Sequence, residues 1–262
     1  MELTTILGII MGVGTVIGAM FLKGVPLSAF NNPAAIVVIF VGTVATILNS
    51  FRGKDLKNIG KLFKLLFTSK KSNEAKVIEE LLSLAAFVRK EGILALEAKL
   101  ANVEDPFLSK ALGMIVDGVD EEYAYDVLTA EVDAMKERHN SNASIFSSAG
   151  TYAPTLGVLG AVFGLIAAMS DINNTENMSH AIAAAFMATI LGIFTGYVLW
   201  NPFATKLKMK SKQEAFEKML IIEGVLSIQK GDHPVRIKEK LIALFPAKQQ
   251  QKLETDISAK EG

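Results

Sequence analysis

Long apolar segments alternate with charged helical segments along the chain. Four segments of about twenty apolar residues are long enough to cross a hydrocarbon core of about 30 Å as helices. They are residues 3–22, 33–50, 150–169 and 180–202. The last two contain no Asp, Glu, Lys or Arg. The pattern therefore predicts an all-α, polytopic membrane protein with four transmembrane helices and a helical domain between its two hairpins.

The first apolar segment is predicted to stay in the protein as a membrane helix. Glu2 stands before it without a basic leader, and no small-residue cleavage pattern follows it. A secretory signal peptide has both of these features. We therefore expect a retained span rather than a signal peptide.

Basic residues indicate which side of the membrane faces the cytoplasm. Residues 52–71 contain Arg52 and six lysines, with Leu56 and Phe63 among apolar residues at helical spacing, and lysines follow the fourth span at 206–212. The loop at 171–178 has acidic residues and no basic ones. By the positive-inside rule, both termini and the middle region are cytoplasmic. The segment 52–71 is predicted to be one basic amphipathic helix on the membrane surface.

The soluble region is predicted to be wholly helical. Ser72 or Asn73 is a candidate cap for a helix that Gly92 interrupts. Asp105 before Pro106 predicts a capped short helix to about residue 116. From Glu121 no helix breaker occurs before the third span, which predicts one long helix that enters the membrane.

The C-terminal region is predicted to extend the fourth span as a helix through Lys230. A turn at 231–234 precedes a last short helix that ends near Phe245, and the polar residues after Ala247 are expected to be frayed or disordered. The chain then has four regions. They are a first transmembrane hairpin (1–51), a cytoplasmic helical domain (52–143), a second transmembrane hairpin that lines the ion path (144–203) and cytoplasmic C-terminal helices (204–262).

Composition argues against catalysis and metal binding. The chain has 262 residues, 27 basic and 27 acidic, with no cysteine and three histidines far apart in sequence. It has no phosphate-binding glycine loop, no nucleophile elbow and no paired-histidine metal motif. We expect no enzyme activity, no cofactor, no metal site and no nucleic-acid partner. The acidic runs at 117–122 and 131–137 are interpreted as solvated helix faces.

Pro154 interrupts the hydrogen bonding of the third span. Proline has no N–H, so the carbonyl of Gly150 loses its helical partner. The hydroxyls of Thr151, Thr155 and Thr189 are candidate donors to it. Two interpretations remain open: a kink that helps packing, or a kink that lines a wet path. Helix packing is assigned to the small residues Gly157, Gly160, Gly164, Gly192 and Gly196.

Neither span of the second hairpin offers an ionisable residue near the middle of the membrane. Relay across a membrane usually needs an ionisable side chain near the midplane. Either the chain is not a transporter, or a partner supplies the carboxylate and this chain supplies the wall around it.

Charged residues at Arg89 and Glu97 flank Gly92. Because Gly92 is expected to bend the helix, both side chains should stand at a corner of the soluble domain. They are either solvated surface charges or a surface that recognises a complementary partner.

Three strings resemble a known family. They are RKEGILALE (89–97), AGTYAPTLGVLGAVFGLIAAM (149–169) and AFMATILGIFTGYVLWNPFATKLKMKS (185–211). They are similar to the MotA stator subunits of the bacterial flagellar motor, within the MotA/TolQ/ExbB proton channel family. The likeness extends from the first span to about Phe245. ExbB and TolQ proteins have three spans, whereas four are predicted here.

The resemblance implies an assembly in the bacterial cytoplasmic membrane that drives flagellar rotation and motility. A homopentamer of this chain would surround a dimer of MotB, a single-span partner that binds peptidoglycan and carries the ion-accepting aspartate. That 5:2 assembly would turn the rotor through its switch protein FliG.

Residue roles are implied position by position. Pro154 would stand beside the partner's aspartate and Pro202 at the end of the fourth span, where both couple conformation to ion flow. Arg89 and Glu97 would face FliG.

The resemblance also implies which ion passes. Thr155 and Thr189 would line the ion path. At two further path positions sodium-driven relatives have threonine, and this chain has Ala161 and Ala188, which favours protons, while Thr189 keeps sodium open. An ExbB-like or TolQ-like transducer and a structural membrane scaffold are the alternatives.

Overall fold

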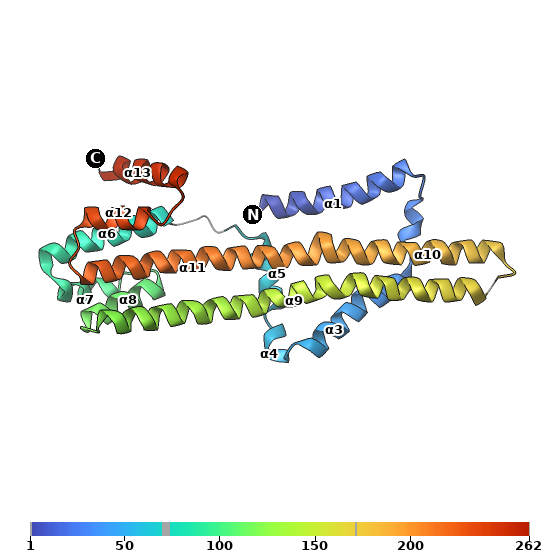
Figure 1. Cartoon of the computed structure of the whole chain (residues 1–262), viewed down its shortest axis with the longest axis horizontal. Coiled ribbons are helices and arrows are strands. Elements are labelled where there is room, and N and C mark those ends of the chain that lie inside the picture. Colours follow the sequence, from blue (N-terminus) through green and yellow to red (C-terminus); the bar gives the residue numbers. More distant parts are fainter. Residues whose placement is uncertain (1, 70–73, 171, 262) are drawn as a thin grey trace. The chain divides into compact units, whose positions relative to one another are not determined.

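The computed structural model describes residues 2–69, 74–170 and 172–261, and these residues form helices joined by short turns (Figure 1). No strand occurs among them. Within these ranges, four helices are long and apolar enough to cross a membrane: Leu3–Leu22, Pro33–Ser50, Glu121–Ser170 and Thr175–Gln229. The all-α, four-span fold class is thus confirmed.

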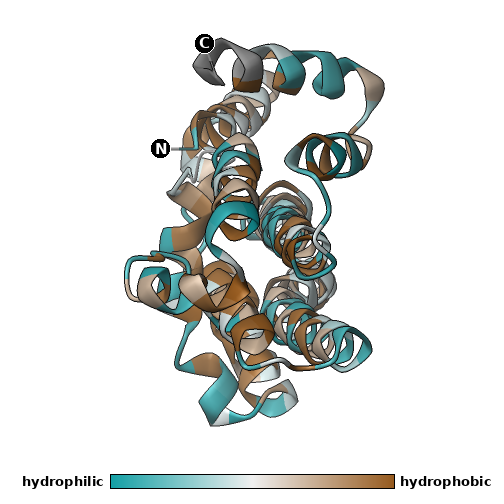
Figure 2. Ribbon diagram, turned by 90° about the vertical axis from the view of Figure 1, so that its left-hand side faces the viewer, coloured by the Kyte–Doolittle hydropathy of each residue, from teal (hydrophilic) through white to brown (hydrophobic). Residues whose placement is uncertain are grey.

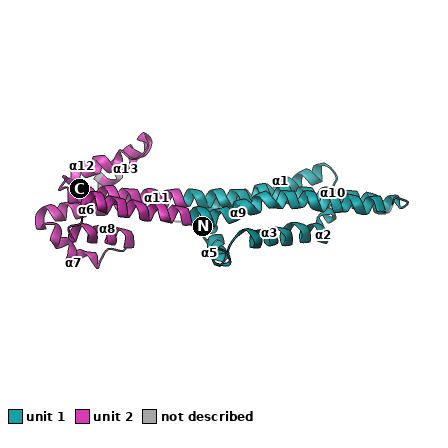
Figure 3. Cartoon of the chain, turned by 60° about the horizontal axis from the view of Figure 1, so that its bottom comes forward, with its two compact units in different colours: residues 1–70, 139–210 teal, residues 71–138, 211–262 magenta. Residues whose placement is uncertain are grey.

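The chain forms two compact units (Figure 3). Unit 1 comprises residues 1–70 and 139–210, and unit 2 comprises residues 71–138 and 211–262. The helices α9 (Glu121–Ser170) and α11 (Asn201–Gln229) each contribute residues to both units.

Unit 1 contains all four apolar segments. Its N-terminal elements are α1 (Leu3–Leu22), η1 (Leu27–Phe30), α2 (Pro33–Ile36), η2 (Val37–Val41), α3 (Gly42–Ser50), α4 (Gly53–Leu56) and α5 (Ile59–Phe67). Its second hairpin consists of the membrane part of α9, then α10 (Thr175–Phe194), η4 (Thr195–Trp200) and the start of α11. Both η2 and η4 are π-helical turns inside otherwise α-helical spans.

Asn32 fixes the start of the second span. Its side-chain oxygen accepts a hydrogen bond from the backbone N–H of Ala35 at 3.1 Å, and Pro33 occupies the first helical position. Its amide nitrogen donates to the carbonyl of Ala184 in α10 at 3.0 Å. One side chain therefore caps α2 and ties the first hairpin to the second.

The basic segment after the second span is two helices, so the expectation of one amphipathic helix over 52–71 was wrong. The segment breaks between α4 and α5. Leu62 and Leu66 of α5 are buried against Phe146 and Phe203 of the second hairpin. Burial of this apolar face within unit 1 sets the direction of α5 independently of α4. Lys70 and Lys71 lie outside the described residues.

Unit 2 has an aliphatic core enclosed by six helical segments and the ends of α9 and α11. These segments are α6 (Glu74–Glu91), η3 (Ile93–Leu96), α7 (Glu97–Leu100), α8 (Pro106–Val116), α12 (Pro234–Ile242) and α13 (Ala247–Glu261). Asp105 caps α8 as predicted, since its carboxylate accepts hydrogen bonds from the N–H groups of Phe107 and Leu108. Gly92 interrupts the chain after α6 with φ +87°, also as predicted. The expected cap at Ser72 or Asn73 lies outside the described residues.

The C-terminal segment is helical, so the expectation of a frayed end after Ala247 was wrong. Its sequence is mostly polar, and Figure 2 shows α13 largely in hydrophilic colours with a few hydrophobic positions. Leu253 and Ile257 are one helical turn apart, and both contact the core of unit 2, with Ile257 fully buried. The packing of these two aliphatic side chains on the core stabilises the helix.

Candidate functional site

The third and fourth spans approach each other most closely at two glycines. A Cβ atom on Gly157 would lie 2.9 Å from the carbonyl oxygen of Ala188 and 3.0 Å from the Cα of Gly192. A Cβ on Gly192 would lie 2.7 Å from the carbonyl oxygen of Ala153. Because the neighbouring atoms belong to the backbone, a side chain at either position would push the helices apart.

The close contact between α9 and α10 continues from Gly157 toward the C-terminal end of α9. A Cβ on Gly160 would lie 3.3 Å from the Cβ of Ala188, and one on Gly164 would lie 2.9 Å from the Cβ of Ala185. Small residues therefore line one face of α9 over about two turns, from Gly157 to Gly164. Ala188, an expected ion-path residue, is buried in this contact.

Pro154 packs against a glycine of the π-helical turn. A Cβ on Gly196 would lie 2.6 Å from the Cγ of Pro154 and 2.8 Å from the carbonyl oxygen of Gly150. The carbonyl that Pro154 deprives of its helical donor thus faces the backbone of η4. The π-helical turn of the fourth span therefore lies against the turn of the third span that contains Pro154. π-Helical turns occur often at functional sites.

The three threonines proposed as donors to Gly150 donate elsewhere. Thr151 donates to Ser147 at 3.0 Å, Thr155 to Thr151 at 3.3 Å and Thr189 to Ala185 at 3.4 Å. Each acceptor is the carbonyl four residues earlier in the same helix. A threonine hydroxyl in a helix can reach this carbonyl within its own chain segment, so the bond forms without help from a second helix.

Asn201 is a residue of this site that the sequence analysis missed. A Cβ on Gly150 would overlap the side-chain amide of Asn201, with its Cγ only 2.5 Å away. Pro202 follows at the second position of α11, and it is exposed. The Asn-Pro pair at the end of an apolar span was the available signal, because a polar amide there needs a partner.

The face of α9 that carries Thr155 is open in the single chain. Thr155 is exposed and Ala161 and Thr189 are half-buried. Large apolar side chains exposed beyond Thr155 include Val158 and Val162. No Asp or Glu occurs at residues 138–170 or 177–213, so this chain brings no carboxylate to the face. Among the described residues, no cluster of His, Asp or Glu is suited to hold a metal ion.

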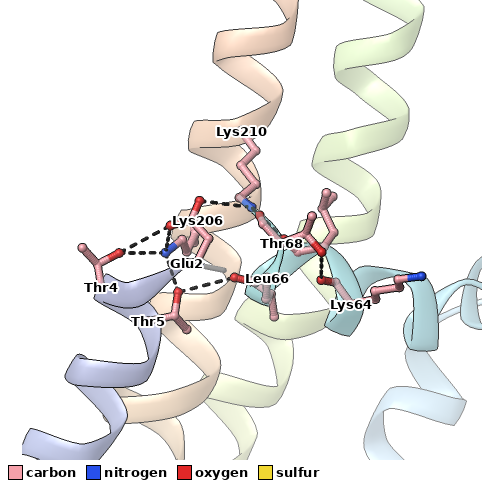
Figure 4. A network of polar contacts seen from close by, with 9 residues as sticks. Glu2, Thr4, Thr5, Lys64, Leu66, Thr68, Lys206 and Lys210 are labelled. Atoms are coloured by element: carbon pink, nitrogen blue, oxygen red, sulfur yellow. Dashed lines mark hydrogen bonds and ion pairs between the residues drawn. The ribbon is translucent and has the colours of Figure 1, made fainter. Parts of the chain in front are cut away.

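A network of polar contacts, here called the polar clamp, connects the N-terminus of unit 1 to α5 and α11 (Figure 4). The Glu2 carboxylate pairs with Lys206 at 2.8 Å and with Lys210 at 3.4 Å. Lys210 also donates to the carbonyls of Leu65, at 2.6 Å, and Thr68, at the end of α5. The hydrogen bond from Lys206 lowers the pKa of Glu2, although burial of the carboxylate opposes this effect. The clamp joins α1, α5 and α11.

Arg89 and Glu97 stand on either side of the turn at Gly92, within unit 2. Both side chains are exposed, one at the end of α6 and the other at the start of α7. Within the described residues neither forms an ion pair. Their charges are therefore available to a partner.

Comparison with known proteins identifies what the chain is similar to. A family model described as "MotA/TolQ/ExbB proton channel family" matches residues 99–219. The chain is 49% identical to "Motility protein A" of Bacillus subtilis (strain 168), an alignment that covers 100% of this chain and 97% of that protein. It is 35% identical to "Motility protein A" of Helicobacter pylori (strain ATCC 700392 / 26695), over 92% of this chain and 94% of that protein.

A solved structure has the same fold. The chain superimposes with a TM-score of 0.89 on a chain of the "flagellar MotAB stator complex from Bacillus subtilis". The two chains are 50% identical, and the match covers 94% of this chain and 97% of the other. The likeness therefore includes both the apolar spans and the helical unit 2.

Proposed function

The chain belongs to the MotA/TolQ/ExbB proton channel family as a flagellar stator subunit, and we propose that it forms its ion path together with a single-span partner of the MotB type. It is a multi-pass membrane protein and a channel subunit rather than an enzyme. One observation carries the proposal of a partner. The second hairpin aligns with a stator protein along its whole length, yet neither of its apolar spans, 150–169 and 180–202, contains a carboxylate. The ion acceptor must then come from another chain.

The partner's aspartate approaches the face of α9 that carries Thr155. This face is apolar and exposed in the single chain, so a helix of another protein has room to lie against it. Thr155, Ala161 and Thr189 form the polar and small positions of the path, and Ala188 supports them from inside the helix contact. Alanine at 161 and 188 gives no extra oxygen to a dehydrated cation, which favours protons over sodium ions.

Pro154 and Pro202 convert a change of charge into a change of packing. Protonation of the partner's carboxylate removes a charge beside Pro154, which rests on Gly196 without intervening side-chain atoms. Interfaces this close have discrete arrangements rather than continuous ones. Pro202 stands six residues after Gly196, at the start of α11, so a shift in η4 passes to that helix.

The proposed assembly is five copies of this chain around two copies of the partner, with unit 2 in the cytoplasm. Arg89 and Glu97 then face the rotor switch protein, FliG. Opposite charges at an exposed corner steer encounter and set register. The abundance of Lys and Arg at 52–71 and 206–212 supports the cytoplasmic placement of this side and of both termini.

Native mass spectrometry of the complex purified from its host tests the composition. We expect five copies of this chain with two of a single-span protein that has a membrane aspartate. A homo-oligomer recovered reproducibly without such a protein would overturn the proposal.

Replacement of Pro154 by alanine tests the coupling. We expect loss of swimming together with altered proton conduction. A Pro154→Ala stator that conducts protons and supports swimming like the wild type would contradict the role given to this residue.

Single-cysteine labelling tests the orientation in the membrane, because the chain has no cysteine of its own. A cysteine at residue 173 is expected to be labelled from outside the membrane, and one near the C-terminus only from the cytoplasmic side.

A further inference from the structure

The most exposed large apolar side chain among the described residues of unit 2 is Leu94. Its exposed fraction is 74%, compared with 63% for Tyr123 and 46% for Leu244. Leu94 lies in η3, directly after the turn at Gly92. Single exposed leucines are common on protein surfaces, so the fixed position of Leu94 and its charged neighbours decide whether it belongs to a contact surface.

The local structure prevents Leu94 from turning inward. Leu96 is fully buried, and Ile93 packs against the same aliphatic core, so η3 is fixed on both sides of the exposed residue. In a 3₁₀ turn, residues three apart share a face, and residues 93 and 96 occupy the inner one. A Cβ placed on Gly92 would have no neighbour within 4 Å, so the turn is also open on its other side. The exposure of Leu94 is therefore a fixed property of the turn.

Unpaired charges of opposite sign border the leucine. Arg89 and Lys90 lie in the last turn of α6, which ends at Glu91, and Glu97 begins α7. No ion pair joins Arg89 to Glu97 in the part of the chain that the structure describes, whereas Lys99 next to them is held over the ring of Phe87 at 4.3 Å. An apolar centre with a charged rim is the usual anatomy of a protein–protein contact.

We propose that Leu94 is the apolar anchor of the rotor-facing corner. The inference rests on the proposed function. The partner is the rotor switch protein, and the surface that fits is an apolar depression with an acidic side chain opposite Arg89 and a basic one opposite Glu97. The two charges set direction and register, while Leu94 provides contact area that excludes water from the centre of the interface.

Binding and torque measurements on leucine variants test the proposal. For the stator complex in nanodiscs with purified rotor switch protein, Leu94→Ala is expected to weaken binding about fivefold, the scale of one truncated interface anchor. Torque per stator should fall, while proton conduction and thermal unfolding stay unchanged. Leu244→Ala, a matched exposed leucine of the same unit, should leave binding and torque at the wild-type level.

Photo-crosslinking in swimming cells gives a second measurement. A photoreactive amino acid at position 94 is expected to form an adduct that mass spectrometry identifies as the rotor switch protein, and the same group at position 244 is not. Equal adducts at both positions, or wild-type binding and torque for Leu94→Ala, would overturn the inference.

Charge reversal of Arg89 distinguishes a failure of the inference on Leu94 from a failure of the rotor-facing role of this corner. If Arg89→Glu weakens torque and Leu94→Ala does not, only the inference on Leu94 fails; if neither does, the rotor-facing role of this corner fails as well.

Discussion

Unit 1 and unit 2 are both helical, but different kinds of contact stabilise the inside of each unit. In unit 2, large aliphatic side chains such as Leu112 and Ile222 are fully buried in one continuous core. In unit 1, apolar side chains such as Phe21, which is 79% exposed, point outward, and the third and fourth spans meet where Gly157 and Gly192 lie against backbone atoms of the opposite helix. Unit 2 buries most of its large apolar side chains, whereas the spans of unit 1 leave many of theirs exposed.

The difference follows from the solvent of each unit. In water, burial of apolar area is the main driving force for helix association. In a lipid bilayer that force is absent, because the lipid is as apolar as leucine, so close packing of small residues decides which helices meet. A substitution should therefore act through lost volume in unit 2 and through added volume in unit 1.

The largest effect is expected for Leu112→Ala in unit 2. Removal of a fully buried leucine side chain leaves a cavity and should lower the free energy of unfolding by about 2–5 kcal/mol. Thermal unfolding of the purified complex, followed by circular dichroism, measures the change. Leu244→Ala, in which the leucine is exposed, should change stability by about 0.5 kcal/mol or less. Equal effects at both positions would show that unit 2 is not held by its core.

Gly157→Ala in unit 1 is expected to have the next largest effect on stability. The new methyl group would lie only 2.9–3.0 Å from backbone atoms of α10, which is closer than van der Waals contact, and overpacking of this kind costs about 1–3 kcal/mol. Gly8→Ala is the control, since a Cβ there would meet nothing within 4 Å. Retention of the complex in detergent on heating measures both. A harmless Gly157→Ala would contradict the close contact between α9 and α10.

A matched pair of helix caps compares the units at the level of single hydrogen bonds. Asp105→Ala in unit 2 should lower stability by about 1 kcal/mol, because two N–H groups at the start of α8 lose their acceptor. Asn32→Ala in unit 1 should cost at least as much, since it also removes the bond to Ala184. Asp105→Asn and Asn32→Asp keep the cap acceptor, and only the second should still be destabilised. The same unfolding assay ranks the four variants.

The smallest effect is expected for Glu2→Gln at the base of unit 1. The pKa of Glu2 is lowered by Lys206, so the folded state binds its proton less readily than the unfolded state. The stabilisation is therefore present above the ordinary carboxyl pKa and is lost as the pH falls through the lowered value. At pH 7 the variant should lose about 1 kcal/mol or less. The difference from the wild type should vanish in strong acid, and a difference that persists there would exclude the ion pair as its cause.

Much of the fold was predictable because periodicity and length are local properties of the chain. The predicted spans 3–22 and 33–50 agree with the observed helices, as do the cap at Asp105 and the long helix from Glu121. The break between α4 and α5 and the docking of α13 were not predictable. Leu62 and Ile257 are unremarkable residues in sequence, and their burial depends on segments far away in the chain.

The amino-acid sequence alone specifies four apolar segments that can cross a membrane, two later spans without Asp, Glu, Lys or Arg, and charges on both sides of Gly92. These properties depend only on which residues are present and in what order. The tertiary structure decided that Gly196 lies against Pro154, that Ala188 is enclosed between two helices, and that Leu94 points outward. The reason is physical. Hydropathy specifies which surfaces leave water, but only the packed helices determine which atoms meet and which side chains remain for a partner.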